Sequence, residues 1–285
     1  MKFAYVSCVK LPEPDFDEQP LISALVELGH TAEVVGWDDP SVDWSSFDVA
    51  LIRAPWNYAW HLDAFRDWIA HASAQTRFIN PPATLAWNLH KGYLSQLRAS
   101  GIAIVPTVYF ERGASTSVAS VCEHHGWSRI VIKPTISAGS FGTRAFTLDT
   151  LAEAQSFFDE MIAQREMMIQ RYIHSVDTVG ETAIVVIDGI ITHAVEKRPR
   201  FHDQTEQVFL RDSISEEMRD IAGRVMAAAG KDHLYARVDV IPDDDGSLLL
   251  AELEMLEPSL FFPHFPDAVG VFVRGLERMM SEVSH

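Results

Sequence analysis

The stretch with the clearest chemical potential is acidic, lies near the C-terminus and contains one arginine. Arg237 and Asp239 are two residues apart, as are Glu252 and Glu254, within two alternating apolar runs joined by an Asp/Gly turn. Residues two apart share one face of a strand. Three carboxylates side by side repel one another unless a cation lies between them. Mg²⁺ takes carboxylate, phosphate and water oxygens, so we predict a magnesium–nucleotide site. The alternative is a solvated acidic hairpin, which the apolar runs disfavour.

A second candidate feature is a loop of small residues that follows a lysine. Ser137, Gly139, Ser140 and Gly142 form this loop, and Lys133 lies four residues before it. Backbone N–H groups in such a loop can closely approach phosphate oxygens. No Gly-Lys-Ser/Thr ends the loop, so it is not a P-loop, and a hairpin turn explains the glycines about equally well. Because buried lysines are rare without a partner, Lys133 favours the phosphate interpretation.

Composition narrows the classes of function. The chain has 285 residues, with 40 acidic residues against 23 lysines and arginines, and a formal charge of −17. Nucleic-acid binding rests on clustered cations, so we expect no such partner. No run approaches the roughly 20 apolar residues of a membrane span, so we expect no membrane association. Two cysteines without motif spacing, and an N-terminus typical of a strand rather than a signal peptide, predict a cytoplasmic protein.

The first part of the chain alternates between strand and helix patterns. Strands are predicted at Lys2–Val9, Thr31–Gly36 and Phe47–Arg53, with a helix at Leu21–Leu28. This alternation indicates βαβ units and a parallel sheet. Ligands of such sheets bind beyond the carboxyl ends of the strands.

Two loops at those carboxyl ends mix charged, proline and aromatic residues. We predict that Asp15, Asp17, Arg53 and Asn57 face a substrate there. Helix caps or turns remain an alternative for the two aspartates.

The middle of the chain supplies further candidates. Thr84–Ala99 is predicted to be one helix that carries Lys91, and the polar segment 198–207 to be a loop. We expect this loop and loop 137–143 to close over the site and exclude water.

The order of these features resembles the ATP-grasp ligases of the glutathione-synthetase-like superfamily. The resemblance covers about 84–258, and the N-terminal unit is similar to that superfamily's pre-grasp domain. The resemblance implies an α/β fold for the chain. An N-terminal parallel-sheet pre-grasp domain would occupy 1–84. An ATP-grasp fold of two α+β subdomains would follow, at 85–173 (the lid with its leading helix) and 174–285. The segments that carry the resemblance are Asn88–Lys91, Val131–Gly142, Ile169–Ile173, Glu181–Gly189 and Arg237–Glu254.

The resemblance implies ATP and Mg²⁺, with two ions and Mn²⁺ as an alternative metal. Lys91 and Lys133 would bind the phosphates under loop residues Ser137, Gly139, Ser140 and Gly142. Gln170, Arg171, Tyr172 and Ile173 would form the adenine hinge, and Asp177 would hold the ribose. Lys197 and Arg237 would act on the transferring phosphoryl group. Asp239 and Glu252, 13 apart as in the family, and Glu254 would bind metal, although Glu254 replaces the usual asparagine.

A closer resemblance is to the ATP-grasp subgroup that contains the O-ureido-serine cyclo-ligase of cycloserine (antibiotic) biosynthesis. Leu11–Asp15, Arg53–Tyr58, 196–201 and Ala251–Phe262 carry it, and Arg198 is a substrate candidate within them. It implies that an amino-acid-like carboxylate is activated as an acyl phosphate and captured by nitrogen, in the same molecule or another. A homodimer is one implied assembly. A small-molecule kinase and a non-catalytic nucleotide-binding protein are the alternatives from other classes.

Overall fold

The computed structural model describes residues 1–198 and 207–281. Its N-terminal unit is a parallel sheet in the order β2-β1-β3-β4. The predicted βαβ alternation is therefore confirmed. Its elements are β1 (Lys2–Ser7), α1 (Glu18–Glu27), β2 (Thr31–Gly36), β3 (Val49–Ile52), α2 (Leu62–Ser73) and β4 (Arg77–Ile79), with short 3₁₀ turns η1 (Trp44–Ser46) and η2 (Tyr58–Trp60).

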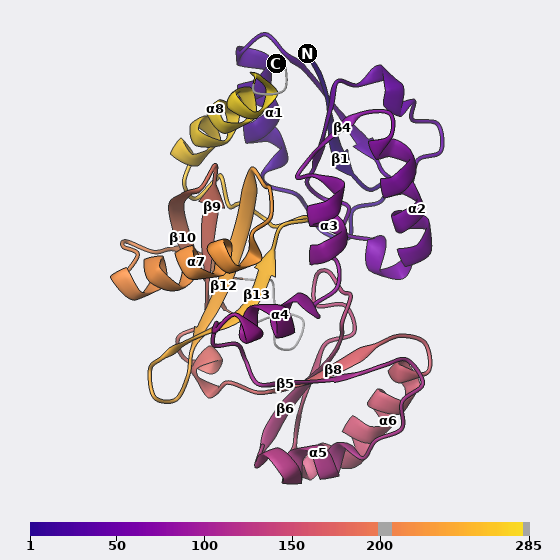
Figure 1. Ribbon diagram of the computed structural model, residues 1–285, viewed down its shortest axis with the longest axis vertical. Helices are drawn as coiled ribbons and strands as arrows, with labels where there is room; N and C mark the ends of the chain where they lie inside the picture. Colours follow the sequence, from indigo (N-terminus) through magenta and orange to yellow (C-terminus); the bar gives the residue numbers. More distant parts are fainter. Residues whose placement is uncertain (199–206, 282–285) are drawn as a thin grey trace.

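A separate antiparallel sheet, in the order β5-β8-β6-β7, forms the lower lobe in Figure 1. Helices α5 and α6 cover one face of this sheet. Alternate residues of β6 point to that face, where they are buried in one core with Phe158 of α6. We call this unit the lid. It contains β5 (Thr107–Phe110), α5 (Val118–His125), β6 (Arg129–Pro134), β7 (Arg144–Thr147), η3 (Leu148–Thr150), α6 (Leu151–Ile162) and β8 (Met167–Arg171).

The third sheet, in the order β11-β10-β9-β12-β13, contains the acidic hairpin. The predicted hairpin is confirmed, and in it Arg237 lies opposite Glu254 and Asp239 lies opposite Glu252. Helix α7 packs its apolar residues onto this sheet. The elements are η4 (His174–Asp177), β9 (Glu181–Ile187), β10 (Ile190–Arg198), β11 (Gln207–Leu210), α7 (Glu216–Ala229), β12 (Tyr235–Pro242) and β13 (Leu248–Glu254).

The single helix predicted at Thr84–Ala99 is wrong. The chain forms α3 (Pro82–Asn88) and α4 (Tyr93–Ala99), with Lys91 in the break between them. The backbone N–H of Lys91 donates to the carbonyl of Thr135, and that of Gly92 donates to Nδ1 of His90. These bonds replace the helical ones, and apolar periodicity alone does not reveal them.

Shared hydrophobic cores hold the units together. Leu94 and Leu97 of α4 share a core with Ile184 of β9, so α4 packs on the third sheet and not on the lid. The C-terminal helix α8 (Asp267–Ser281) packs against α1, and its Phe272 lies in the core that contains Tyr5 of β1. The chain thus returns to its starting unit, where α8 lies beside α1 (Figure 1).

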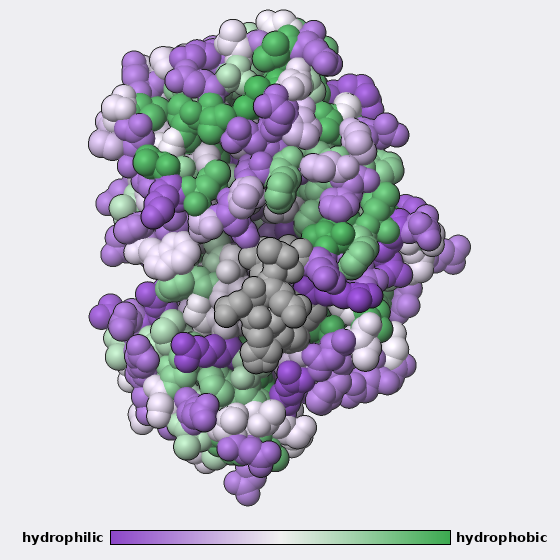
Figure 2. All heavy atoms as spheres, turned by 180° about the vertical axis from the view of Figure 1, so that it is seen from behind, coloured by the Kyte–Doolittle hydropathy of each residue, from purple (hydrophilic) through white to green (hydrophobic). Residues whose placement is uncertain are grey.

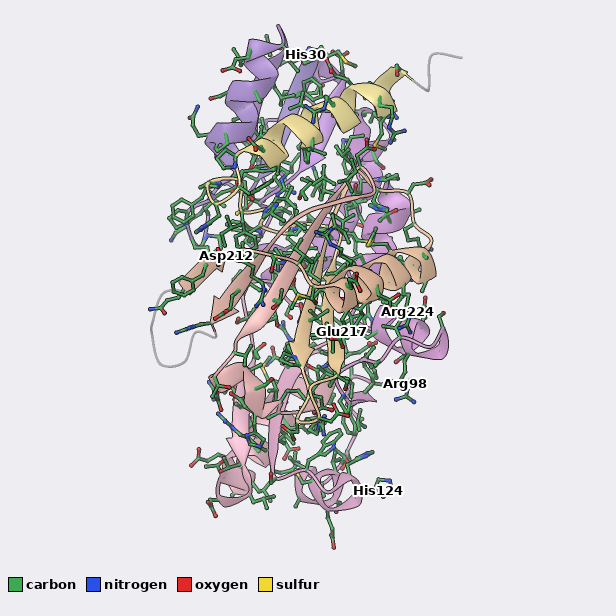
Figure 3. The ribbon with its side chains drawn as sticks, turned by 90° about the vertical axis from the view of Figure 1, so that its left-hand side faces the viewer. His30, Arg98, His124, Asp212, Glu217 and Arg224 are labelled. Atoms are coloured by element: carbon green, nitrogen blue, oxygen red, sulfur yellow. The ribbon has the colours of Figure 1, made fainter. Side chains whose placement is uncertain are left out.

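The molecule is elongated, with His30 of the N-terminal unit at one end and His124 of the lid at the other (Figure 3). Hydrophilic residues cover most of its rear face, where a notch sets the lower lobe off from the rest (Figure 2). No helix within the described residues is long and apolar enough to cross a membrane.

Candidate active site

A cavity of about 850 Å³ lies where the three units meet. Most of the residues predicted from the sequence to bind nucleotide or metal, or to act in catalysis, line it. The predicted residues in its wall are Lys91, Lys133, Ser137, Gly139, Ser140, Tyr172, Ile173, Lys197, Arg198, Arg237, Asp239, Glu252 and Glu254. The structure thus brings together side chains from segments more than 160 residues apart.

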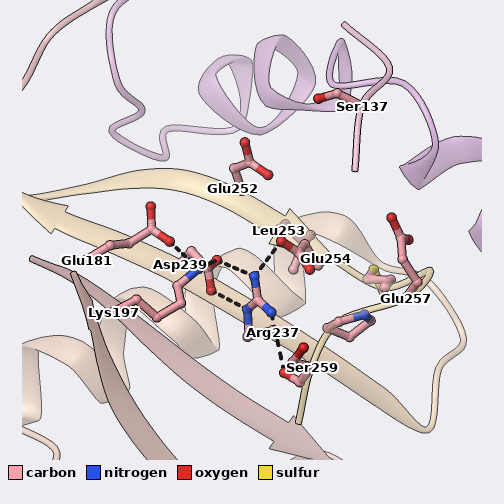
Figure 4. Close-up of polar contacts among 12 residues, drawn as sticks. Ser137, Glu181, Lys197, Arg237, Asp239, Glu252, Leu253, Glu254, Glu257 and Ser259 are labelled. Carbon is pink, nitrogen blue, oxygen red and sulfur yellow. Dashed lines mark hydrogen bonds and ion pairs between the residues drawn. The ribbon is translucent and has the colours of Figure 1, made fainter. Parts of the chain in front are cut away.

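Arg237 is the centre of the cavity floor. Its Nε and Nη2 donate to the two carboxylate oxygens of Asp239, each at 2.8 Å, and Nη2 also donates to Glu254 at 2.5 Å (Figure 4). Burial opposes the charge of Asp239, but Arg237 and Lys197 outweigh it and hold the pKa of Asp239 well below its usual range. Nη1 donates to the carbonyl of Ser259 at 3.4 Å. The guanidinium therefore has a fixed orientation.

Lys197 joins two carboxylates. Its ammonium lies 2.7 Å from Oδ2 of Asp239 and 2.5 Å from Oε1 of Glu181. Glu181 was not among the site residues predicted from the sequence. A signal was available, because β9 and β10 form a hairpin in which Lys197 lies opposite Glu181. Burial raises the pKa of Glu181 to about 7.

Glu252 is held by two lysines from other parts of the molecule. Nζ of Lys133 lies 2.6 Å from Oε1, and Nζ of Lys91 lies 3.7 Å from Oε2. Burial favours the neutral acid, but Lys133 and Lys91 outweigh burial and lower the pKa of Glu252 to about 2. Glu252 is therefore a carboxylate at neutral pH, and both lysines already face the acidic hairpin.

The glycine loop has a backbone that few side chains tolerate. Gly139, Ser140 and Gly142 all have positive φ, between 55° and 64°. A Cβ on Gly142 would lie 2.8 Å from Met161, so Gly142 shapes the loop although it does not line the cavity. The carbonyl of Ser137 accepts hydrogen bonds from Lys91 and from the hydroxyl of Tyr58. The loop is thus tied to both neighbouring units.

The predicted hinge is divided between sheet and cavity. Gln170 lies in β8, paired on both sides, and its side chain donates to Thr107. The N–H of Arg171 donates to Pro106, while its guanidinium pairs with Asp243, away from the cavity. The N–H of Tyr172 donates to Arg129. Ile173 lies beyond the strand and lines the cavity, so its backbone is the best placed of the four to meet a ligand.

Asp177 lies just behind the cavity wall. Its carboxylate accepts from Arg129 at 2.8 Å and from the hydroxyl of Tyr172 at 2.5 Å, and both of these partners line the cavity. Arg129 also stacks its guanidinium over the Tyr172 ring, 3.5 Å from the centroid. Arg129 opens strand β6 and was not selected from the sequence.

Asp17 and Arg53, predicted to face a substrate, lie outside the cavity wall. The carboxylate of Asp17 accepts the N–H groups of Leu260 and Phe262, and Arg53 donates to the carbonyl of Pro258 at 2.6 Å. The two side chains pair at 3.6 Å, and both are almost fully buried. This placement joins the N-terminal unit to the segment after the hairpin.

Asp15 and Asn57 also bond within the N-terminal unit. Asp15 accepts from the hydroxyl of Tyr5 at 2.5 Å, and Asn57 bridges Trp37 and Asp38. Neither lines the cavity. The loop of Asn57 does reach the cavity, through two flanking aromatic residues that sequence reasoning did not select, Trp56 and Tyr58.

Glu257 completes the acidic wall three residues after Glu254. Its backbone carbonyl accepts a hydrogen bond from the indole of Trp56 at 3.1 Å. Burial, reinforced by Glu254, raises the pKa of Glu257 to about 7.

The carboxylates fit a hard cation that takes its other ligands from a substrate. Asp239 and Glu252 face each other across the hairpin, and both are held as anions. Within the described residues, however, no group of three acidic, histidine or cysteine side chains is arranged to hold a metal ion. A site with only one or two protein carboxylates is typical of Mg²⁺ that takes its remaining ligands from phosphates and water. It is not typical of a metal ion enclosed entirely by protein ligands.

Fold and site together define the class. The chain has a parallel N-terminal unit, a lid and a third sheet with a lysine- and carboxylate-lined cavity between them, and solved ATP-grasp ligases share this architecture. D-alanyl-alanine synthetase A from Vibrio cholerae matches with a TM-score of 0.71 at 13% identity over 99% of both chains. The ATP-grasp ligase PsnB matches with a TM-score of 0.66 at 17% identity, over 96% of this chain and 98% of that one. These two likenesses establish the fold.

Closer relatives establish the family. Residues 3–80 match the model of the D-cycloserine synthetase DcsG N-terminal domain. The cycloserine biosynthesis protein DcsG of Streptomyces lavendulae is 31% identical over 92% of this chain and 93% of its own length. The crystal structure of D-cycloserine synthetase DcsG matches with a TM-score of 0.90 at 30% identity, over 98% of this chain and 99% of that one. The chain belongs to the DcsG family of ATP-grasp ligases and is an ATP-dependent ligase.

Proposed function

We propose that this enzyme uses ATP to activate the carboxylate of a small amino-acid-like substrate as an acyl phosphate, which a nitrogen of the same molecule then captures. The product is a ring of the cycloserine type. The observation that carries the proposal is the fixed guanidinium of Arg237, which lies on the cavity floor between Asp239, Glu254 and Ser259. The S. lavendulae relative is named for cycloserine biosynthesis. The resemblance seen in the sequence makes O-ureido-serine the substrate to test first.

Charge neutralisation is the main demand of phosphoryl transfer. ATP would enter between the lid and the hairpin, where Lys133 and Lys91 would exchange Glu252 for phosphate oxygens. Arg237 and Lys197 would then face the transferring phosphoryl group. The substrate carboxylate attacks the γ-phosphorus and ADP leaves, which gives the acyl phosphate. Its charge develops beside the guanidinium of Arg237.

The nitrogen then attacks the acyl carbon, the C–N bond forms, and the bond from carbon to the phosphate oxygen breaks with release of phosphate. Holding nitrogen and acyl phosphate in one molecule lowers the entropic barrier. Segment 198–207, which was predicted to close over the site, lies mainly outside the described residues. Arg198, at its start, lines the cavity.

Asp239 and Glu252, with Glu254 nearby, are the residues that would hold Mg²⁺. A magnesium ion there would orient the β- and γ-phosphates and offset their charge. Two ions, and Mn²⁺ as a substitute, remain part of the proposal.

The test is a screen for substrate-dependent ADP release with O-ureido-serine, serine, alanine and pairs of amino acids. We expect O-ureido-serine alone to release ADP and phosphate and to yield a cyclic product. ADP release that requires two amino acids would indicate an intermolecular ligase. A stable phosphorylated product without an amide bond would indicate a kinase and overturn the proposal.

A further inference from the structure

Glu257 differs in its charge balance from four other carboxylates that line the cavity. Each of the others is paired with a cation: Glu181 with Lys197, Asp239 with Lys197 and Arg237, Glu252 with Lys133 and Lys91, and Glu254 with Arg237. No ion pair joins Glu257 to a lysine or arginine in the part of the chain that the structure describes. In Figure 4 Arg237 is joined to its three partners, and Glu257 stands apart from them.

The position of Glu257 is nevertheless firmly set. Trp56 donates to its backbone carbonyl, and Arg53 donates to the carbonyl of Pro258, the next residue. Two residues of the N-terminal unit thus hold the backbone of this segment, and they fix the place of Glu257 in the cavity wall.

A partly desolvated carboxylate that has no ion-pair partner is costly, so it tends to take up a proton or to bind a cation that enters the site. The four carboxylates named above each have a lysine or arginine partner. The missing partner at Glu257 is therefore to be sought in the ligand. The segment also carries Ser259, whose carbonyl bonds to Arg237, so a carboxylate and a guanidinium lie on the same wall. Such a pair of opposite charges complements an amino-acid zwitterion.

We propose that Glu257 binds the primary ammonium group of the amino-acid substrate, with Arg237 facing the carboxylate end. This proposal rests on the proposed function in one respect, that the substrate is an amino acid. It assigns a subsite that selects amino acids over the corresponding acids without an amino group.

The test is calorimetric binding in the presence of Mg²⁺ and a non-hydrolysable ATP analogue. Ligands are used as matched pairs that differ only in the amino group: O-ureido-serine with its deamino analogue, serine with 3-hydroxypropanoate, and alanine with propanoate. The wild type should prefer the amino member of at least one pair by about 10- to 100-fold, the range for hydrogen bonds to charged groups. Glu257→Gln should abolish that preference by weakening only the amino member.

Two variants sharpen the result. Glu257→Asp keeps the charge and should keep a reduced preference, which guards against a folding defect in Glu257→Gln. Glu13→Gln changes another carboxylate of the cavity wall and should leave the preference intact. Binding of the ATP analogue should match wild type in all three variants.

The proposal is overturned if Glu257→Gln keeps the preference, if Glu13→Gln loses it instead, or if no amino acid binds the wild type. A lowered kcat with the preference intact also overturns it, because Glu257 would then act on the reacting nitrogen. The proposed function fails differently: amino acids would bind with the preference intact, but no ring would form.

Discussion

Nζ of Lys133 lies 2.6 Å from Oε1 of Glu252, although the two residues belong to the lid and to the acidic hairpin of the third sheet. In this state a cation expected to hold phosphate instead neutralises a carboxylate expected to hold metal. The lid is thus tied to the hairpin by charges that a magnesium–nucleotide complex would satisfy separately.

Metal binding should therefore depend on nucleotide. We expect Mn²⁺, followed by electron paramagnetic resonance, to bind weakly to the protein alone and at least about tenfold more tightly when an ATP analogue occupies Lys133, because phosphate oxygens complete the ligand set. Glu252→Gln should abolish this gain. Equal Mn²⁺ affinity with and without nucleotide would rule out the coupling.

Arg237→Ala should lower kcat by about 10²- to 10³-fold, because it removes a preorganised cation from the site of developing charge. Arg237→Lys should recover only part of this loss, since an ammonium cannot reproduce the fork to Asp239. Steady-state ADP release is the measurement, and binding of the ATP analogue reports folding.

The control for Arg237 is Arg278→Ala, which removes a half-exposed surface arginine paired with Asp188. Its turnover should match wild type. Unchanged turnover in Arg237→Ala would remove Arg237 from the mechanism.

Asp17→Ala should destabilise the protein by about 3–5 kcal/mol, since it leaves Arg53 buried without its counter-charge. Urea unfolding measures this. Asp63→Ala, which removes a fully exposed carboxylate paired with Arg66, should change stability by less than about 0.5 kcal/mol. If Asp17→Ala instead keeps its stability and raises only KM, the substrate role predicted from the sequence is favoured.

His193 should make stability depend on pH. Nε2 of its buried ring contacts the carbonyl oxygen of Leu260, and burial lowers its pKa to about 4. Between pH 6.5 and 4 the unfolded chain takes up a proton that the folded one refuses, so this contribution is present above pH 6.5 and is lost as pH falls. The full loss is about 3 kcal/mol, because each pH unit between 6.5 and about 4 contributes roughly 1.4 kcal/mol.

Thermal unfolding at pH 7 and pH 5 tests this. His193→Gln should reduce the difference in Tm between the two pH values, whereas His124→Gln, on the exposed surface of α5, should not. An unchanged difference in His193→Gln would show that other groups cause the acid sensitivity.

Much of the site was predictable from local pattern. The hairpin of Arg237 and Glu252 follows from alternation and a turn, and Lys133 follows from a strand that ends before small residues. What failed depends on contacts distant in sequence. The helix break at Lys91 arises from a bond to Thr135, and the burial of Arg53 arises from Pro258, 205 residues away.

Glu181 and Tyr58 were missed for a related reason. Each is an ordinary residue of a strand or turn until the fold brings it to the cavity. Register across β9 and β10 could have found Glu181, because it lies opposite Lys197. No local signal marks Tyr58.

The proposed mechanism requires that a substrate carboxylate receive the γ-phosphoryl group. The most direct measurement uses O-ureido-serine with ¹⁸O in its carboxylate and follows the label by mass spectrometry of the released phosphate. An acyl phosphate transfers one labelled oxygen to each phosphate, because the bond from carbon to that oxygen breaks when nitrogen attacks. Phosphate that carries no label, or that takes its oxygen from labelled water, would contradict the account.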